Sequence, residues 1–186
     1  MFSPSGLINL LRERATSAGL WQPQCHDRGT ELLRQGASCG RLLLLTGGLA
    51  KLNYLTQSGD EWIKSFIVDQ GVFGAFEGGV TRFGAVAIEP CTVARVPIDW
   101  VKDVLATDQQ LATEAGVFYR WLVERKQQRE EALLCDTAET RYRQMLLTEA
   151  ELLARLPQGD IARYLRVTPV AFSRIKRRVR AVSHTG

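Results

Sequence analysis

The fold of this chain is constrained most by one stretch, residues 157–179, with the sequence PQGDIARYLRVTPVAFSRIKRRV. Residues 158–165 place apolar side chains on one helical face, and Thr168-Pro169 is a favourable cap and first residue for a second helix. The second helix has an apolar stripe at helical spacing, made of Phe172, Ile175 and Val179. Because only two residues separate the helices, they must cross steeply. The stretch therefore predicts a helix-turn-helix, whose second helix enters the major groove of DNA.

The outward face of the second helix is strongly basic, with five cations between residues 174 and 180. A solvated surface helix would explain the cations, but not the apolar stripe on the same helix. We therefore predict a DNA-binding face, with Arg174 at a guanine edge and the later cations at phosphates. A phosphate contact is the alternative for Arg174. The predicted residues are Thr168, Pro169, Val170, Ala171, Ser173, Arg174, Lys176, Arg177 and Arg178.

The net charge of +4 is unevenly distributed along the 186 residues. Residues 1–140 have a net charge of −3, whereas residues 141–186 have a net charge of +7. The surplus positive charge thus lies beside the predicted helix-turn-helix, where contacts with phosphate groups need it. This distribution favours double-stranded DNA as a partner.

Residues 21–96 follow a different pattern, in which short runs typical of β-strands alternate with glycine-containing breaks. The sequence LAKLNYL at 49–55 alternates apolar and polar side chains, and QSGD at 57–60 predicts a hairpin turn into a strand over 61–68. Further strands are expected at residues 31–33, 42–45, 85–88 and 92–96, with turns at Gly47-Gly48 and Gly78-Gly79. Six short strands at this spacing predict a sandwich or barrel, preceded by a short helix over residues 7–15.

After residue 97 the pattern returns to helical, with a short helix over 98–105 and a long one over 108–135. The long helix has a coiled-coil-like stripe, made of Leu111, Ala115, Phe118 and Leu122. Because helix-turn-helix proteins commonly contact two half-sites, we predict that this stripe joins two copies of the chain. The alternative is that the stripe packs only on its own barrel. Asp136-Thr137 predicts the cap of the next helix.

The sequence offers little for catalysis or metal binding. Only His26 lies in the strand region, and His184 is near the C-terminal end, so we expect no metal and no cofactor. No nucleophile–base or carboxylate pair is evident, so we do not expect an enzyme. The cysteines are widely spread, at Cys25, Cys39, Cys91 and Cys135. This spacing predicts a reduced, cytoplasmic protein, with redox sensing by one thiol as the alternative.

The order of strands, long helix and helix-turn-helix resembles the Crp/Fnr family of bacterial transcription factors. The matching motifs are Gly59-Asp60-Glu61 with Gly71-Val72-Phe73-Gly74, and Asp160-Ile161-Ala162, Leu165, Thr168-Pro169 and Ser173-Arg174-Ile175. The resemblance implies an α+β fold, with a cyclic-nucleotide-binding-like β-roll over residues 1–107, a dimerisation helix over 108–135 and a helix-turn-helix domain over 136–186. It also implies a homodimeric DNA-binding regulator, with RNA polymerase as a further partner.

Positions at which this family binds cyclic nucleotides differ in this chain. By resemblance, Ala75 replaces a glutamate that holds the ribose, Phe83 follows Arg82 in place of a hydroxyl residue, and Arg125-Lys126 replaces a Thr-Ser pair. A buried phosphate needs several fixed donors, so we expect at most weak cyclic AMP binding and, at Arg82 and Arg125, a different small anionic effector. The candidate effector residues are Gly74, Ala75, Arg82 and Arg125. The alternative function is a cyclic-nucleotide-type sensor module that acts through protein contacts.

Overall fold

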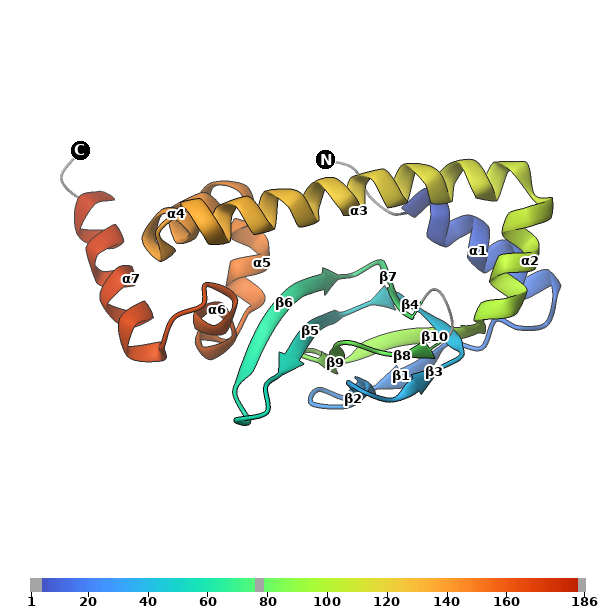
Figure 1. Ribbon diagram of the computed structural model, residues 1–186, viewed down its shortest axis with the longest axis horizontal. Coiled ribbons are helices and arrows are strands. Elements are labelled where there is room, and N and C mark those ends of the chain that lie inside the picture. The colour runs from blue at the N-terminus through green and yellow to red at the C-terminus, as the bar shows by residue number, and fades with distance from the viewer. Residues whose placement is uncertain (1–4, 76–78, 184–186) are drawn as a thin grey trace.

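The computed structural model describes residues 5–75 and 79–183, so Gly78 and His184 lie outside the described residues. Figure 1 shows a roll of β-strands beneath one long helix, with shorter helices at both ends of the molecule. Within the described ranges, no helix is long and apolar enough to cross a membrane.

Within the described residues, the strands form two four-stranded antiparallel sheets and one separate strand pair. The first sheet has the order β1-β10-β4-β7, made of β1 (Gln24–His26), β10 (Cys91–Pro97), β4 (Arg41–Gly47) and β7 (Gly71–Gly74). The second has the order β2-β9-β5-β6, made of β2 (Glu31–Leu33), β9 (Gly84–Ala87), β5 (Leu49–Leu55) and β6 (Glu61–Val68). The remaining pair is β3 (Ser38–Cys39) with β8 (Gly79–Val80). All six expected strands are therefore present.

Two of the expected turns are confirmed by their backbone geometry. In the β5–β6 hairpin, Thr56 N donates to Asp60 O at 2.9 Å, and Gly59 has a φ of 86°. Between β4 and β5, Gly48 has a φ of 91°, and a Cβ there would lie 2.1 Å from Pro90 O. Only glycine fits this second turn, because a side chain would collide with fixed backbone.

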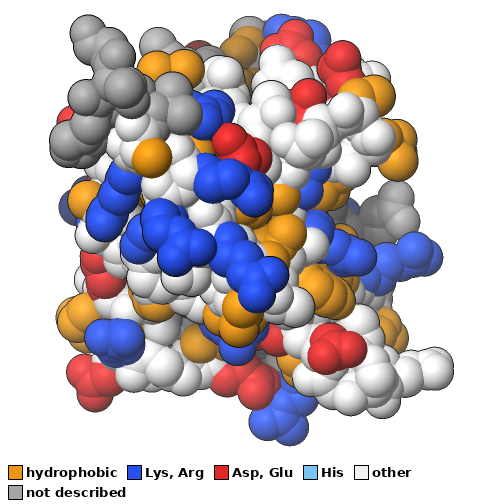
Figure 2. Space-filling model, turned by 90° about the vertical axis from the view of Figure 1, so that its left-hand side faces the viewer, with side chains coloured by type: hydrophobic (Ala, Val, Ile, Leu, Met, Phe, Trp, Pro, Cys, Tyr) orange, Lys and Arg blue, Asp and Glu red, His pale blue; other side chains and the backbone are white. Residues whose placement is uncertain are grey.

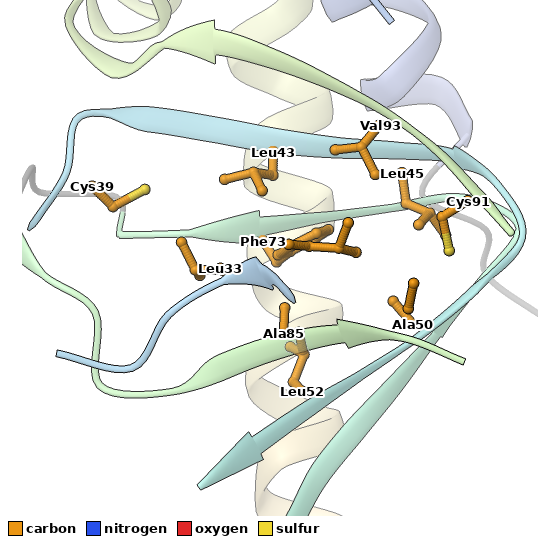
Figure 3. Packing of buried hydrophobic residues seen from close by; sticks show 12 residues of the cluster. Leu33, Cys39, Leu43, Leu45, Ala50, Leu52, Phe73, Ala85, Cys91 and Val93 are labelled. Carbon is orange, nitrogen blue, oxygen red and sulfur yellow. The ribbon is translucent and has the colours of Figure 1, made fainter. Parts of the chain in front are cut away.

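The first core fills the interior of the roll (Figure 3). Side chains from the two sheets face each other around Phe73, which is 2% exposed. Those labelled in Figure 3 include Leu43, Leu45 and Val93 from the first sheet and Ala50, Leu52 and Ala85 from the second. The alternation of apolar residues along the strands thus places one face of each sheet in this core.

Seven helices are described, and they are α1 (Ser5–Ser17), α2 (Ile98–Thr107), α3 (Gln109–Cys135), α4 (Ala138–Thr148), α5 (Ala150–Arg155), α6 (Gln158–Tyr164) and α7 (Pro169–Ser183). Asp108 caps α3, since its Oδ1 accepts from Leu111 N at 3.0 Å. Thr137 caps α4 as expected, since its Oγ1 accepts from Thr140 N at 3.1 Å. Arg14 Nε donates to Asp108 Oδ2 at 2.7 Å and so ties α1 to the start of α3.

The second core lies between the outer face of the first sheet and the helices α1, α2 and α3. Leu111 is 0% exposed and Phe118 is 5% exposed, and Ala115 and Leu122 pack against the same core. Leu111 and Phe118 thus pack within their own chain, and the prediction that this stripe joins two copies stays a prediction. Both side chains are already covered within one chain, chiefly because α1 lies against α3.

The third core joins the helix-turn-helix to the second sheet of the same chain. Ile161 and Leu165 pack with Leu49, and the rings of Phe66 and Tyr164 lie 5.1 Å apart. Ion pairs flank this core: Lys51 Nζ lies 3.0 Å from Asp160 Oδ1, and Arg155 Nη2 lies 3.0 Å from Asp69 Oδ1 and 2.6 Å from Glu89 Oε2. The C-terminal helices are thus packed on the roll. The predicted division of the chain into domains at residues 107 and 135 stays a prediction.

Candidate nucleic-acid interface

A short turn fixes the crossing of α6 and α7. Leu165 follows the last residue of α6, and Arg166 has a left-handed φ of 62° that reverses the chain. The Arg166 guanidinium lies 4.3 Å from the ring centroid of Trp62 on β6, and this contact holds the turn against the roll. Thr168 Oγ1 accepts from Ala171 N at 3.2 Å, so Thr168 caps α7 as predicted.

Two arginines from other helices fix the end of α6. Arg129 on α3 donates to Tyr164 O at 2.6 Å, and Arg141 on α4 donates to Leu165 O at 2.7 Å. Cations at the carbonyl end of a helix also complement its dipole. The helix-turn-helix therefore has a defined orientation relative to the long helix.

The two faces of α7 differ sharply in exposure. Phe172, Ile175 and Val179 are buried, and the ring of Phe172 meets Tyr142 edge-on at 5.0 Å. The opposite face is exposed and consists of Val170, Ser173, Arg174 and Arg177, at the spacing of one helical stripe. Figure 2 shows a band of Lys and Arg side chains at this end of the molecule. We call Val170, Ser173, Arg174 and Arg177 the outer stripe.

The predicted DNA-binding residues differ in whether they are already bonded. Lys176 Nζ donates to Gln158 Oε1 at 2.6 Å, and Arg178 Nε donates to Glu139 Oε2 at 2.8 Å. The side chains of Arg174 and Arg177 have no hydrogen bond or ion pair with any described residue. The structure thus brings Ser173, Arg174 and Arg177 together on one open face, and turns Lys176 and Arg178 towards neighbouring helices.

Comparison with known proteins identifies the architecture. No family model and no curated protein matches this sequence. Among solved structures, FixK2 from Bradyrhizobium japonicum is 20% identical with a TM-score of 0.78, covering 88% of this chain and 86% of that one. A CooA variant from Carboxydothermus hydrogenoformans is 14% identical with a TM-score of 0.80, covering 98% and 87%. The c-di-GMP-responsive regulator CLP of Xanthomonas campestris is 14% identical with a TM-score of 0.76, covering 96% and 93%.

This chain has the Crp/Fnr fold. The fold class predicted from the sequence is therefore confirmed: a β-roll, a long helix and a helix-turn-helix follow one another in that order. At these identities the likeness establishes the fold, and the roles of single residues have to come from the structure itself.

The candidate effector residues predicted from the sequence have different surroundings in this chain. Gly74 ends β7, and Ala75 packs against the core of the roll. Arg82 is exposed, whereas Arg125 lies 3.7 Å from Glu149 and over the ring of Trp121. No contact between described residues joins Arg82 to Arg125. Their common anion site therefore stays a prediction.

Lys64, which the sequence did not single out, lies between the roll and the long helix. Lys64 occupies a bulge in β6, since Ile63 and Ser65 pair with adjacent residues of β5. Its ammonium group lies 4.0 Å from the ring centroid of Phe83. Burial, and secondly the charge of Lys126 on α3, lowers the pKa of Lys64 to about 8. One lysine in an apolar run carries no signal of a bulge, so only the strand pairing reveals it.

Replacing Lys64 with methionine is expected to stabilise the protein at neutral pH. The pKa of Lys64 is about 8 in the folded chain, below its ordinary value of 10.5, so the unfolded chain binds more protons between these values. Stability of the natural protein should therefore rise as pH increases across that window. Lys64→Met should remove this rise, as measured by urea unfolding at several pH values. An unchanged pH profile in the variant would contradict the assignment.

Proposed function

We propose that the protein is a DNA-binding transcription regulator that acts as a homodimer. The observation that carries this proposal is the outer stripe of α7, where Arg174 and Arg177 extend beside Ser173 without an acidic partner among the described residues. Arginine presents several donors in one plane and pairs with guanine or with phosphate. The net charge of +7 in residues 141–186 supports the same partner.

The two arginines take different roles in this proposal. Thr168, Pro169 and Ala171 lie at the start of α7, where the positive end of the helix dipole favours phosphate. Arg174 follows one turn later and reaches a base edge, while Arg177, a further turn along, contacts the DNA backbone. Lys176 and Arg178 make lesser contributions, because their present bonds would have to break first.

Arg174→Ala is expected to weaken binding to the preferred DNA site by about 1–3 kcal/mol and binding to random duplex far less. Arg177→Ala should weaken binding to both duplexes alike. It should also lower the slope of log affinity against log salt concentration by about one, the value for one phosphate contact. The preferred site is obtained by selection from a random duplex pool, and affinities by fluorescence anisotropy at several salt concentrations. Arg178→Ala is the matched control, because Glu139 already binds Arg178 and a smaller loss is expected.

Two outcomes would count against these assignments. Equal loss on the preferred and random duplexes in Arg174→Ala would remove the base-reading role. If the natural protein showed no salt-dependent binding to any duplex, DNA binding itself would be wrong.

For the homodimer, we propose a face of α3 that is turned away from its own roll. Tyr119 is 66% exposed and Leu134 is 78% exposed, although both are large and apolar. Gly116 and Val123 share a stripe with Tyr119 at the 3-4 spacing of paired helices, and Gly116 would let a second backbone approach. Exposed apolar side chains aligned on one helix are typical of a protein–protein contact.

The proposal also includes an effector region without the residues for binding cyclic AMP. It is supported by the packing of Ala75 against the roll core and by the engagement of Arg125 with Glu149. RNA polymerase is a further proposed partner, by analogy with the fold alone. A cytoplasmic location is supported by the cysteines, all four of which are free thiols.

A further inference from the structure

A cavity of about 410 Å³ opens at the end of the roll next to the start of α2. Its walls come from the ends of β4, β10 and β1 and from the segment that links α1 to β1. The polar and charged residues among its walls are Gln22, Gln24, Arg41 and Arg95. None of the residues expected from the sequence to bind DNA or an effector lines this cavity.

A second cavity of about 300 Å³ shares Arg41 and Arg95 with the first. Its other walls are largely apolar and include Leu32, Leu33 and Leu43. The two arginines therefore stand between a polar cavity and an apolar one. We call the two together the roll-end cavity.

The strand pairing explains why the arginines meet. Arg95 on β10 pairs with Leu43 on β4, and Arg41 lies two residues before Leu43. All three side chains consequently lie on one face of the sheet, because alternate residues of a strand point the same way. Arg41 and Arg95 are diagonal neighbours across the strand pair, roughly 7–8 Å apart at the backbone, which both guanidinium groups can span to one anion.

Neither guanidinium group is neutralised by a carboxylate among the described residues, and that of Arg95 is held by neutral side chains. Arg95 Nη1 lies 3.3 Å from Gln24 Oε1 and 3.1 Å from His26 Nε2. Burial, and secondly the charge of Arg95, lowers the pKa of His26. The Arg41 side chain has no hydrogen bond or ion pair with the described residues. Neither cavity has an aspartate or glutamate in its described lining.

We propose that the roll-end cavity binds a small organic anion, with a carboxylate or phosphate group on Arg41 and Arg95 and an apolar part on Leu32, Leu33 and Leu43. Paired arginines suit such planar or multi-oxygen groups, because they form charge-assisted bonds to two oxygens. The volume lies in the range of small-molecule sites. This site goes beyond the proposed DNA-binding function and does not depend on it.

The test uses calorimetry on the full chain with four probes: octanoate, octyl phosphate, 1-octanol and inorganic phosphate. One of the two organic anions should bind with one site per chain, and octanol and inorganic phosphate each roughly tenfold more weakly or worse. The stronger of octanoate and octyl phosphate shows which head group the site prefers. Arg41→Gln should weaken that binding roughly tenfold or more. Arg28→Gln, at an exposed arginine between β1 and β2 that lines neither cavity, is the matched control and should bind as the natural protein does.

Three results would overturn the proposal. The first is that octanol binds as tightly as the anions, and the second is that Arg41→Gln leaves anion binding unchanged. The third is that no probe binds at about 10 mM. Folding is checked by thermal unfolding without ligand. Arg41→Gln should unfold at the same temperature as the natural protein or higher, because it removes a cation without a counter-ion. Arg95→Gln is a second variant, and if it fails to fold, Arg41→Gln decides alone.

Discussion

Replacing Phe118 with aspartate is expected to remove most of the protein's stability instead of releasing folded monomers. Phe118 is 5% exposed and lies 5.6 Å from the ring of Trp121, within the core that joins α1, α2 and α3. Loss of a buried phenylalanine side chain costs about 3–5 kcal/mol, and a buried unpaired carboxylate adds to this loss. Domains of this kind are stable by only about 5–15 kcal/mol. Urea unfolding followed by circular dichroism measures the effect.

The neighbouring residue provides the control. Tyr119 is 66% exposed, so Tyr119→Asp should change the free energy of unfolding by only about 0.5 kcal/mol. It should nevertheless convert the proposed dimer into a monomer, as measured by light scattering, because it places charge in the middle of the exposed apolar stripe of α3. If Phe118→Asp were a folded monomer and Tyr119→Asp remained a dimer, the dimer contact would lie on the stripe that contains Phe118. The proposed contact through Tyr119 would then be wrong.

Sequence predicted correctly those features that depend on neighbouring residues. The helix starts at Thr137 and Thr168 follow from local capping bonds, and the turn at Gly59 follows from the residues of its own hairpin. The alternation in β5 likewise encodes which side faces the core. By contrast, the strands β1, β3, β7 and β8 were not expected. Each has only two to four residues, and each pairs with a strand that lies far away in the sequence.

Features that depend on distant partners could not be predicted. The helical spacing of Leu111 and Phe118 indicated an apolar face, but not that α1, a hundred residues earlier, covers it. The charge of Arg178 suggested a DNA contact, yet its bond partner Glu139 lies 39 positions away. The roll-end cavity likewise depends on the pairing of β4 with β10, which brings Arg41 close to Arg95. The sequence indicates which face of a helix or strand is apolar or charged. Which distant segment contacts that face is seen only in the folded chain.

The contact between the helix-turn-helix and the roll depends on buried charges that are just as distant in sequence. Lys51 Nζ lies 3.0 Å from Asp160 Oδ1 on α6 and 3.0 Å from Glu61 Oε1 on β6. The exposed fractions of the three side chains are only 13%, 8% and 19%. Arg163 Nη1 lies 3.1 Å from the same oxygen of Asp160, but Arg163 is 44% exposed, which weakens its electrostatic effect.

Lys51→Met is expected to destabilise the protein by about 3–5 kcal/mol, because it removes the more buried of the two cations, Lys51 and Arg163, that pair with both Asp160 and Glu61. Arg34→Met is the control. It breaks the ion pair with Glu31, whose side chains are 76% and 46% exposed, and should cost at most about 1 kcal/mol. Urea unfolding measures both variants.

A triple variant separates the energy of the ion pairs from the cost of leaving charges unpaired. Lys51→Met combined with Glu61→Gln and Asp160→Asn removes all three charges and keeps the side-chain volumes nearly constant. The triple variant leaves neither carboxylate as a buried charge, so it should recover most of the loss in Lys51→Met. If the triple variant were as unstable as Lys51→Met, the loss would come from packing around the lysine chain. If Lys51→Met cost no more than Arg34→Met, the helix-turn-helix would be held on the roll by its apolar core alone.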